Sequence, residues 1–551
     1  MTTRPRTPGS SEATRLLCAG TYLDGAFRDA VIDELYVHEE RIAAPSLGID
    51  AARVLAHALR ARRLETGWAA GIVLLWIVAV PLTQWLILFY VPAFALFTLA
   101  GWLRGPQERP FWVRRVIAWY VRLIGWVCYA LALVVLLAPA LFGGGVGPSR
   151  LPGPFGSLGG GTGGDLRIQA WCALVLPLLL AWAVAAQRGQ FAKSLTEELS
   201  RPRFPALATD PAEAAEGDRF QRLARRIRAE QHAPLVLYHV TNPFCGAGRP
   251  YEPWSLSVEL RPDKDRVPEP LDNSAILRRI VPLLEALRVP SPHGSPERAA
   301  AVRDRLRELE LDEIVFLPVL GLPSRAAGPY DGRSFEEHRA RAIEEGGETR
   351  RHFLRIRVGG WGEEIVTTVF VRVHTQGGML MLEVAPHVLR PVRQLYQDAD
   401  RAAHRYRHNN RFGKAVWALA HTPAAGGRAV LTLWRGAVSL GRLAAGGYGR
   451  ALPEGPVRSV REMGSENDAS LFQEMDVSRY LKSIQDRVAN GVRLALQEAG
   501  WETDEFVQKI VNVAEGATFI ETAKGAIAIG DRNTVINKTT TAGKAGGRGN
   551  G

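Results

Sequence analysis

The stretch NPFCGAG, residues 242–248, is the part of this sequence that most resembles a reactive site. Cys245 could act as a nucleophile, with His239 or His374 as its base and the backbone amides of the two following glycines as an oxyanion hole. The alternative is a glycine turn after a strand, in which the cysteine only fills space. No third group orients a base, and nothing nearby predicts a lowered thiol pKa. We therefore predict a non-enzymatic protein, with a membrane-tethered enzyme acting through Cys245 as the alternative.

Other cofactor and metal chemistry has little support in the sequence. The Gly-x-Gly of the same stretch lacks the rest of a dinucleotide fingerprint and is followed by no P-loop lysine. The cysteines stand apart, without the spacing of a zinc site or a disulfide framework, at positions Cys18, Cys128, Cys172 and Cys245. The sequence predicts no catalytic, cofactor-binding or metal site.

An uncharged stretch, residues 68–103, indicates that the chain is anchored in a membrane. As one helix it would be roughly 54 Å long, well beyond a hydrocarbon core of about 30 Å. It must fold back, and Pro81, Thr83 and Gln84 mark the expected turn because proline breaks the helix and the polar pair prefers water. The first arm is then short, so two short spans and a re-entrant hairpin are both open.

Two further apolar segments, 118–142 and 168–186, flank a glycine-rich loop at 143–164. Arginines cluster before the first span, between the second and third, and after the fourth, whereas the glycine-rich loop has few. Because basic residues concentrate on the cytoplasmic side, we predict a multi-pass cell-membrane protein with a membrane domain at 67–187 and both termini cytoplasmic. A transporter or channel component is a further alternative, although the four apolar cores, counted after Arg122 in the third segment, hold no Asp, Glu, Lys, Arg or His.

The segment before the membrane domain, 1–66, is predicted to be cytoplasmic and to contain a helix. After the membrane domain, residues 205–400 alternate between strand and helix patterns. Strands are expected at 234–240, 254–260, 312–320, 353–358, 364–375 and 379–386, and Gln376-Gly377-Gly378 is a plausible hairpin turn between the last two. The predicted fold class is an α-helical membrane domain of about four helices plus a cytoplasmic α+β domain with a mixed or antiparallel sheet.

The chain resembles a family of actinobacterial multi-pass membrane proteins. The resemblance rests on the four-pass front, on NPFCGAG followed by WSLSVEL, and on VRVHTQGGMLMLEVAPHVLRPV. It covers most of the chain and implies a shared architecture, but no activity.

A basic segment follows at 401–453, with nine lysines and arginines and no acidic residue, against a net charge of +12 for the whole chain. If residues 427–443 are helical, Arg428, Arg435 and Arg442 recur every seven residues and drift only about 20° per step. The other side carries apolar residues, including Trp434. This pattern is typical of an amphipathic helix on an anionic inner leaflet. Packing of the helix on the rest of the protein is an alternative, and nucleic acid is not the expected partner.

The last part of the chain is predicted to be a linker and helical module at 454–515, followed by a β-prone tail at 516–551 that ends in disorder. Within this tail, IAIGDRNTV resembles the core of the RIP homotypic interaction motif and its amyloid-signalling relatives. The matching residues are Ile527, Ile529, Gly530, Asn533 and Val535, and Ala528 stands where that core usually has glutamine. Short β-prone segments with an asparagine ladder stack into cross-β structure.

The resemblance implies self-assembly, or docking on a protein partner, through the tail. A plain β-hairpin cap and a disordered tail are the alternatives. Together, these features predict an integral membrane anchor, scaffold or signalling protein that presents a cytoplasmic interaction domain.

Overall fold

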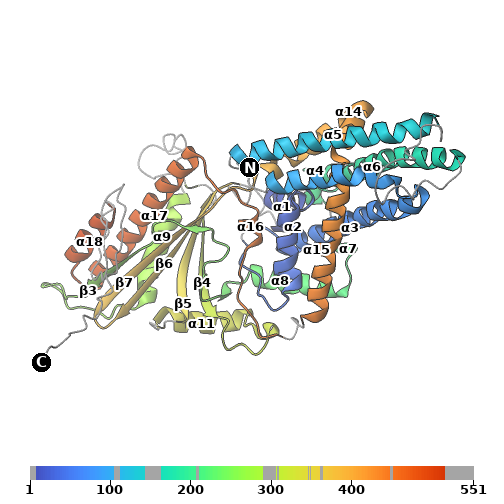
Figure 1. Ribbon diagram of the computed structural model, residues 1–551. Coiled ribbons are helices and arrows are strands. Elements are labelled where there is room, and N and C mark those ends of the chain that lie inside the picture. The colour runs from blue at the N-terminus through green and yellow to red at the C-terminus, as the bar shows by residue number, and fades with distance from the viewer. Residues whose placement is uncertain are drawn as a thin grey trace, which may run out of the picture.

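The computed structural model describes residues 8–46, 48–104, 112–142, 163–206, 210–288, 306, 309–344, 347, 349–359, 364–446 and 451–514. It confirms the predicted fold class, with a bundle of apolar helices beside an α+β domain that contains a mixed sheet (Figure 1).

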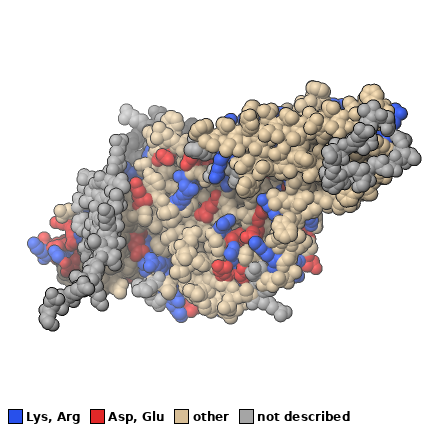
Figure 2. All heavy atoms as spheres, viewed as in Figure 1, with Lys and Arg blue, Asp and Glu red and all other residues tan. Residues whose placement is uncertain are grey.

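In the part of the chain that the structure describes, four helical segments are long and apolar enough to cross a membrane. They are formed by α3 (Ala51–Leu82), η3 and α4 (Leu86–Tyr90 and Val91–Arg104), α5 (Trp112–Phe142) and α6 (Gly163–Glu197). Many large apolar side chains on them are exposed, including Trp102, Val127 and Trp182. Figure 2 shows few charged side chains over this part of the molecule on the face in view. Exposed apolar surface of this extent is suited to lipid rather than water.

The fold-back between the first two segments lies where the sequence predicts it. Helix α3 ends at Leu82, and the next residues turn with positive φ angles at Gln84 and Trp85. Because α3 already begins at Ala51, the apolar arm that looks short in the sequence is the end of a 32-residue helix. The uncharged arm is therefore the continuation of a longer helix, and α3 as a whole is long and apolar enough to be a candidate span.

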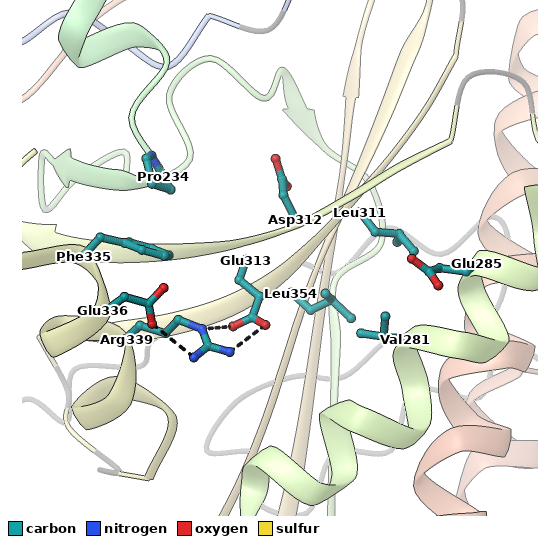
Figure 3. Close-up of a pocket in the computed structure, with 10 residues that line it drawn as sticks. All are labelled: Pro234, Val281, Glu285, Leu311, Asp312, Glu313, Phe335, Glu336, Arg339 and Leu354. Atoms are coloured by element: carbon teal, nitrogen blue, oxygen red, sulfur yellow. Dashed lines mark hydrogen bonds and ion pairs between the residues drawn. The ribbon is translucent and has the colours of Figure 1, made fainter. Parts of the chain in front are cut away.

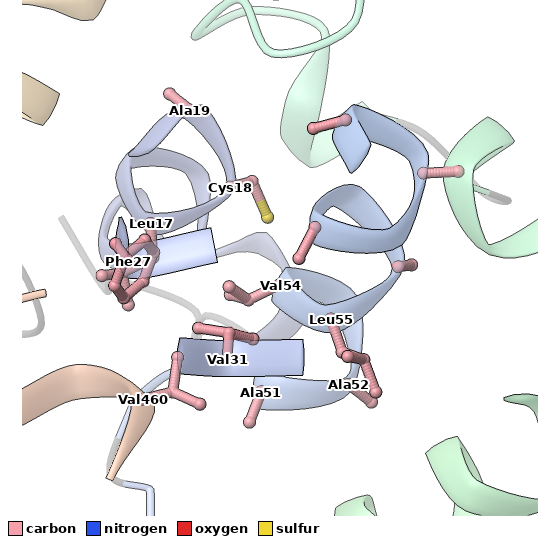
Figure 4. Packing of buried hydrophobic residues seen from close by; sticks show 14 of the residues in the cluster. Leu17, Cys18, Ala19, Phe27, Val31, Ala51, Ala52, Val54, Leu55 and Val460 are labelled. Atoms are coloured by element: carbon pink, nitrogen blue, oxygen red, sulfur yellow. The ribbon is translucent and has the colours of Figure 1, made fainter. Parts of the chain in front are cut away.

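A buried helical base joins the membrane helices to the rest of the protein. It is formed by α1 (Glu12–Leu23), α2 (Gly25–Ile32), the π-helical turn η2 (Asp33–Val37), α7 (Pro211–Ala214), α8 (Asp218–Gln231), the first turns of α3 and the last turns of α6. Figure 4 shows part of this core, where Cys18, Val31 and Val54 pack together. Residues before the first span and after the fourth thus share one hydrophobic cluster, so both flanks of the bundle lie on the same side.

The sheet has seven strands, with the order β1-β4-β5-β6-β7-β2 and with β3 also paired to β7. Among the strands that the structure describes, β1 and β4 form a parallel pair and the other pairs are antiparallel. The bounds are β1 (Leu235–Tyr238), β2 (Arg249–Pro250), β3 (Trp254–Glu259), β4 (Glu310–Pro318), β5 (Arg351–Gly359), β6 (Val366–Gln376) and β7 (Met379–Leu389).

The predicted hairpin turn is confirmed between β6 and β7. Gln376 pairs with Met379 across the turn, so Gly377 and Gly378 form a two-residue loop. Both glycines have positive φ angles, of 60° and 76°. This is the arrangement that a type I′ turn requires, and it explains why two glycines stand here.

One face of the sheet is covered by helices. The helices of this domain are α9 (Asn273–Glu285), α11 (Gly332–Glu344), α17 (Leu471–Glu498) and α18 (Asp504–Ala514). Apolar side chains of α17, such as Ile484 and Val488, share a cluster with Val369 and Val371 of β6. Helix α17 follows the predicted linker, yet it packs on β6, whose residues precede it by about a hundred positions in the sequence. Short 3-10 turns complete the fold at η1 (Pro8–Ser10), η6 (Phe204–Ala206), η7 (Ala286–Arg288) and η8 (Arg325–Ala327).

Between the sheet and α17 the chain returns to the membrane helices. Helices α13 (Ala399–His408) and α14 (Arg411–His421) contact α6, and α15 (Ala425–Ala445) contacts α3 and α4. The short helices α12 (Gln394–Gln397) and α16 (Val460–Met463) lie before and after this group of three helices. A junction segment, residues 451–466, then leads back to the sheet domain.

A buried ion pair ties the helical base to the sheet domain. Glu230 lies in the last turn of α8, and its carboxylate accepts hydrogen bonds from Arg325 Nε at 2.7 Å and from the backbone amide of Ala43 at 2.8 Å. Arg325 also donates to the carbonyl of Glu39 at 2.7 Å. Both charged side chains are almost fully buried. Charges in such a place need each other, because either one alone would be desolvated without compensation.

We expect Arg325→Ala to lower the free energy of unfolding by about 3–5 kcal/mol, because it leaves the buried Glu230 carboxylate without its cation. The matched control is Arg341→Ala on α11, whose ion pair with Glu337 is exposed, and we expect a loss of about 0–1 kcal/mol there. Urea unfolding of the detergent-solubilised full chain measures both. Equal losses in the two variants would contradict a role for Arg325 in joining the two parts.

Candidate functional site

The NPFCGAG loop lies between β1 and β2 and is built around two glycines in the left-handed region. Gly246 and Gly248 have φ angles of 100° and 96°. A Cβ atom at Gly246 would stand 2.3 Å from the carbonyl oxygen of Pro45, and one at Gly248 would stand 2.3 Å from that of Val388. The loop is therefore closely packed between the N-terminal segment and β7, and only glycine fits at these two positions.

The two amides that could form an oxyanion hole are already bound within the protein. Gly246 N and Gly248 N donate to one oxygen of Glu462, at 2.8 and 2.9 Å. Glu462 comes from α16 in the junction segment, more than two hundred residues further along the chain. Burial raises the pKa of its carboxyl group, and the two amides offset part of that rise. The carboxylate of Glu462 therefore occupies the place where these two amides could bind an anion.

Cys245 is only 4% exposed. Burial raises the pKa of its thiol well above the ordinary value, and the Glu462 and Glu34 carboxylates act in the same direction. Since the thiolate is the reactive form, this environment keeps the group unreactive.

The two histidines proposed as bases for Cys245, His239 and His374, make other contacts. His239 Nδ1 lies 2.7 Å from Thr241 Oγ1. His374 is paired with Met381 on the sheet, and burial lowers its pKa. The backbone of His239 forms an isolated bridge with Asn242 of the loop. The fold brings a third histidine, His387, against the loop, with its ring centroid 4.7 Å from that of Phe244. His374 stands six residues along β6 from the partner of His387, or about 20 Å at the usual rise of a strand.

These contacts make the loop a joint between three segments that are distant in the sequence. It contacts the N-terminal segment, β7 and α16 at once. The two closely spaced glycines indicate a tight turn from sequence alone. Glu462 could not be predicted, because no local pattern relates it to a loop so far away.

The four residues predicted to face the membrane all lie on α15. Arg428 donates to the carbonyl oxygen of Ala424, one turn earlier, and to that of His421, the last residue of α14. Arg435 and Arg442 are exposed and stand near acidic side chains of α2 and η2. Trp434 is 66% exposed.

Helix α15 combines a packed side with an exposed apolar side. Ala425 and Ala429 are buried against the membrane helices, whereas Val430, Leu431 and Leu440 are exposed. A Cβ at Gly426 would lie 3.4 Å from Trp76 Nε1, and one at Gly436 would lie 3.7 Å from Thr66. Both contacts are with α3, and they run in opposite order along the two helices, so α15 and α3 are antiparallel. The start of α15 lies at the level of Trp76, about 12 Å along α3 from the beginning of the uncharged stretch at residue 68.

A cavity of about 420 Å³ lies between β4, α9 and α11 (Figure 3). Its carboxylates are engaged in part, since Glu313 accepts from Arg339 Nη2 at 2.9 Å and lies 2.9 Å from His352 Nε2. Burial raises the pKa of Glu313, but these two bonds outweigh it and bring the value to about 2. The lining residues are Pro234, Val281, Glu285, Leu311, Asp312, Glu313, Phe335, Glu336, Arg339 and Leu354. Arg339 pairs with Glu313 and Glu336 inside the cavity, whereas Asp312 pairs with Arg355 and Arg357 outside it.

Among the residues that the structure describes, no group of three or more His, Cys, Asp or Glu side chains could hold a metal ion. The residues of the predicted interaction motif, Ile527, Ile529, Gly530, Asn533 and Val535, lie outside the described ranges. The prediction for the tail therefore rests on the sequence.

The fold and these sites define a membrane protein in which an α+β domain is joined to four apolar helices through a buried helical base. A family model described as AbeC-like domain matches residues 253–532, a little over half of the chain. The chain belongs to this AbeC-like family. The matched region begins at β3 and includes α13 to α15, so the helices that return to the membrane are part of the family domain. No curated protein and no solved structure matches the chain.

We expect Glu462→Ala to release the NPFCGAG loop, because it removes the acceptor of two amides, and to cost about 1–3 kcal/mol per unsatisfied donor. The Cys245 thiol should then react with iodoacetamide at pH 8 much faster than in the native protein. Glu462→Gln keeps one side-chain oxygen and serves as the matched control, with a smaller increase. Mass spectrometry of the Cys245 peptide measures the rates. A thiol that already reacts freely in the native protein would refute this account of the loop.

Proposed function

We propose that this protein is a non-enzymatic membrane scaffold that presents its AbeC-like domain to the cytoplasm in a signalling role. The observation that carries the proposal is the continuity of α3 and α6, which extend from their apolar segments into the buried helical base. A domain held in this way keeps a fixed orientation relative to the membrane. Such an arrangement suits a protein that positions partners.

The cytoplasmic orientation is inferred from charge. Arg60, Arg62 and Arg63 precede the first apolar stretch on α3, and Arg188 and Lys193 follow the apolar part of α6. Both groups flank the helical base. Because loops rich in arginine and lysine stay in the cytoplasm, the base and the sheet domain belong on that side of the cell membrane.

The non-enzymatic part of the proposal rests on the state of the only nucleophile candidate that the sequence suggested. The thiol of Cys245 is buried, and the amides beside it donate to Glu462. Both features favour a structural loop. The protein's own chemistry is then recognition, of the anionic inner leaflet through α15 and of a protein partner or a second copy through the tail.

The topology can be tested with single cysteines in a background without the four native ones. We expect Lys264→Cys, in an exposed part of the sheet domain, to react with a membrane-impermeant maleimide only after cell lysis. Ser149→Cys, in the glycine-rich loop, should react in intact cells because this loop has few arginines. Labelling of Lys264→Cys in intact cells would refute the cytoplasmic orientation.

For the tail, a peptide covering residues 503–551 should form fibres that bind an amyloid dye. Gly530→Asp should abolish them, because stacked copies would place identical charges next to one another along the fibre. Thr541→Asp adds the same charge outside the nine-residue core and should leave fibre formation unchanged. If the unsubstituted peptide never forms fibres, self-assembly through this motif is refuted, while docking on a different protein would remain to be measured by co-purification.

A further inference from the structure

A second cavity, of about 350 Å³, lies where α15 meets the helical base. Its volume is within the range of small-molecule sites. It is open between α2, η2, α3 and α15. Helix α3 contacts both α2 and α15, and these three helices are labelled in Figure 1. The residues that line it are Asp29, Ala30, Asp33, Val37, Arg62, Trp434, Arg435, Val438, Ser439 and Arg442. The predicted membrane-surface residues Trp434, Arg435 and Arg442 thus converge on one cavity, and α3 adds Arg62.

The charged groups of this cavity are only loosely paired. Asp29 lies 3.9 Å from both Arg62 and Arg435, and Asp33 lies 3.6 Å from Arg442. These distances exceed those of charge-assisted hydrogen bonds, which are about 2.7–2.9 Å. Three guanidinium groups, each with five N–H donors, face two carboxylates. The cavity therefore has a surplus of positive charge and of donors.

One of the three arginines is held in place by α15 itself. Arg62 donates to Ser439 Oγ at 2.8 Å and to the backbone carbonyl of Arg435 at 3.1 Å. The side chains of Arg435 and Arg442 are 58% and 59% exposed, so they can turn toward a ligand. The site thus combines one fixed cation with two mobile ones.

The cavity lies next to the end of an apolar segment, which is where phospholipid headgroups would be. Arg62 precedes by six residues the uncharged stretch of α3 that begins at residue 68, a rise of about 9 Å. Trp434 lies at the rim and is largely exposed, as is typical of tryptophan at a membrane interface. The apolar side chains next to it on α15, Val430 and Leu431, are exposed as well. An acyl chain has an apolar path from the cavity along this side.

We propose that this cavity binds the phosphate of one anionic phospholipid of the cytoplasmic leaflet, held by Arg62, Arg435 and Arg442. The inference rests on the proposed membrane-surface role of α15 and makes it specific, because it replaces a general attraction to the leaflet with a single headgroup site. Arginine forks bind phosphate oxygens in pairs, which a point charge cannot do. Basic pockets between membrane helices on the cytoplasmic side are suited to such headgroups. The phosphate would take the donors that Asp29 and Asp33 now meet at long range.

The test uses the purified full chain in mild detergent and native mass spectrometry to measure binding of phosphatidylglycerol and phosphatidylcholine. We expect one phosphatidylglycerol to bind in preference to phosphatidylcholine. The pair Arg435→Gln and Arg442→Gln should weaken this binding about thirtyfold, given the usual contribution of each basic residue near an anionic leaflet. The matched control is the pair Arg278→Gln and Arg341→Gln, which removes the same charge from exposed positions of the sheet domain and should leave binding unchanged.

Two further variant pairs separate a built site from general attraction. Arg435→Lys with Arg442→Lys keeps the charge but loses the fork, so it should bind more weakly than the native protein. If it binds equally well, the headgroup site is refuted, while the proposed membrane-surface role of α15 stands. Asp29→Asn with Asp33→Asn should bind more tightly, and an effect in this direction cannot come from loss of folding.

The remaining outcomes concern the source of the phosphate. Inorganic phosphate at millimolar concentration should not displace the bound lipid. If it binds as tightly as the lipid and depends on the same arginines, the ligand is a soluble phosphate compound and the lipid assignment is wrong. A protein that shows no preference for phosphatidylglycerol at all would refute both the site and the membrane-surface role.

Discussion

The architecture depends on two helices that must suit two solvents. The apolar parts of α3 and α6 are exposed where lipid would surround them, and their other ends are buried in a protein core. A helix that satisfies its own backbone hydrogen bonds can cross from one environment to the other without interruption. The helical base forms where the two continuous helices meet α1, α2 and α8. The remaining parts of the protein are attached to that base, so their orientation relative to the membrane is decided there.

The core of the helical base contains arginine side chains, and each buried charge there requires a partner. Asp210 shows how this is achieved, since it lies 2.6 Å from Arg53 Nε and 3.0 Å from His57 Nε2. Burial raises the pKa of this carboxyl group, but the two partners outweigh it and hold the pKa below the ordinary value. The carboxylate is therefore charged at neutral pH. Its contribution to stability is present there and is lost only in strong acid. Arg15 is satisfied in the same way, by Asp400 and by the carbonyl of Leu199.

The elements of this fold could be predicted from sequence, but their assembly could not. Periodicity identified the strands at 353–358 and 364–375, and two glycines identified the hairpin turn at 377–378, because these signals are local. The membrane turn near Gln84 was equally clear. By contrast, nothing local relates Glu462 to the glycine loop, Arg325 to Glu230, or α17 to the sheet. Likewise, the three arginines spaced seven residues apart on α15 predict an amphipathic helix. The cavity that α15 shares with Arg62, however, depends on how α15 packs against α3.

Helix α15 illustrates why a basic amphipathic pattern is ambiguous by itself. Its small residues, Gly426, Ala429 and Gly436, allow close contact with α3 and α4, while its large apolar ones, Val430 and Trp434, are exposed. Packing on protein and contact with lipid are alternatives if the apolar face of α15 is treated as uniform. In the structure, its small residues pack on protein and its large apolar residues are exposed to the surroundings. The arginines stand at the border between the packed and the exposed side. A charge at that border can reach an acidic side chain of the base or a headgroup of the leaflet, and competition between these two anions follows from its position.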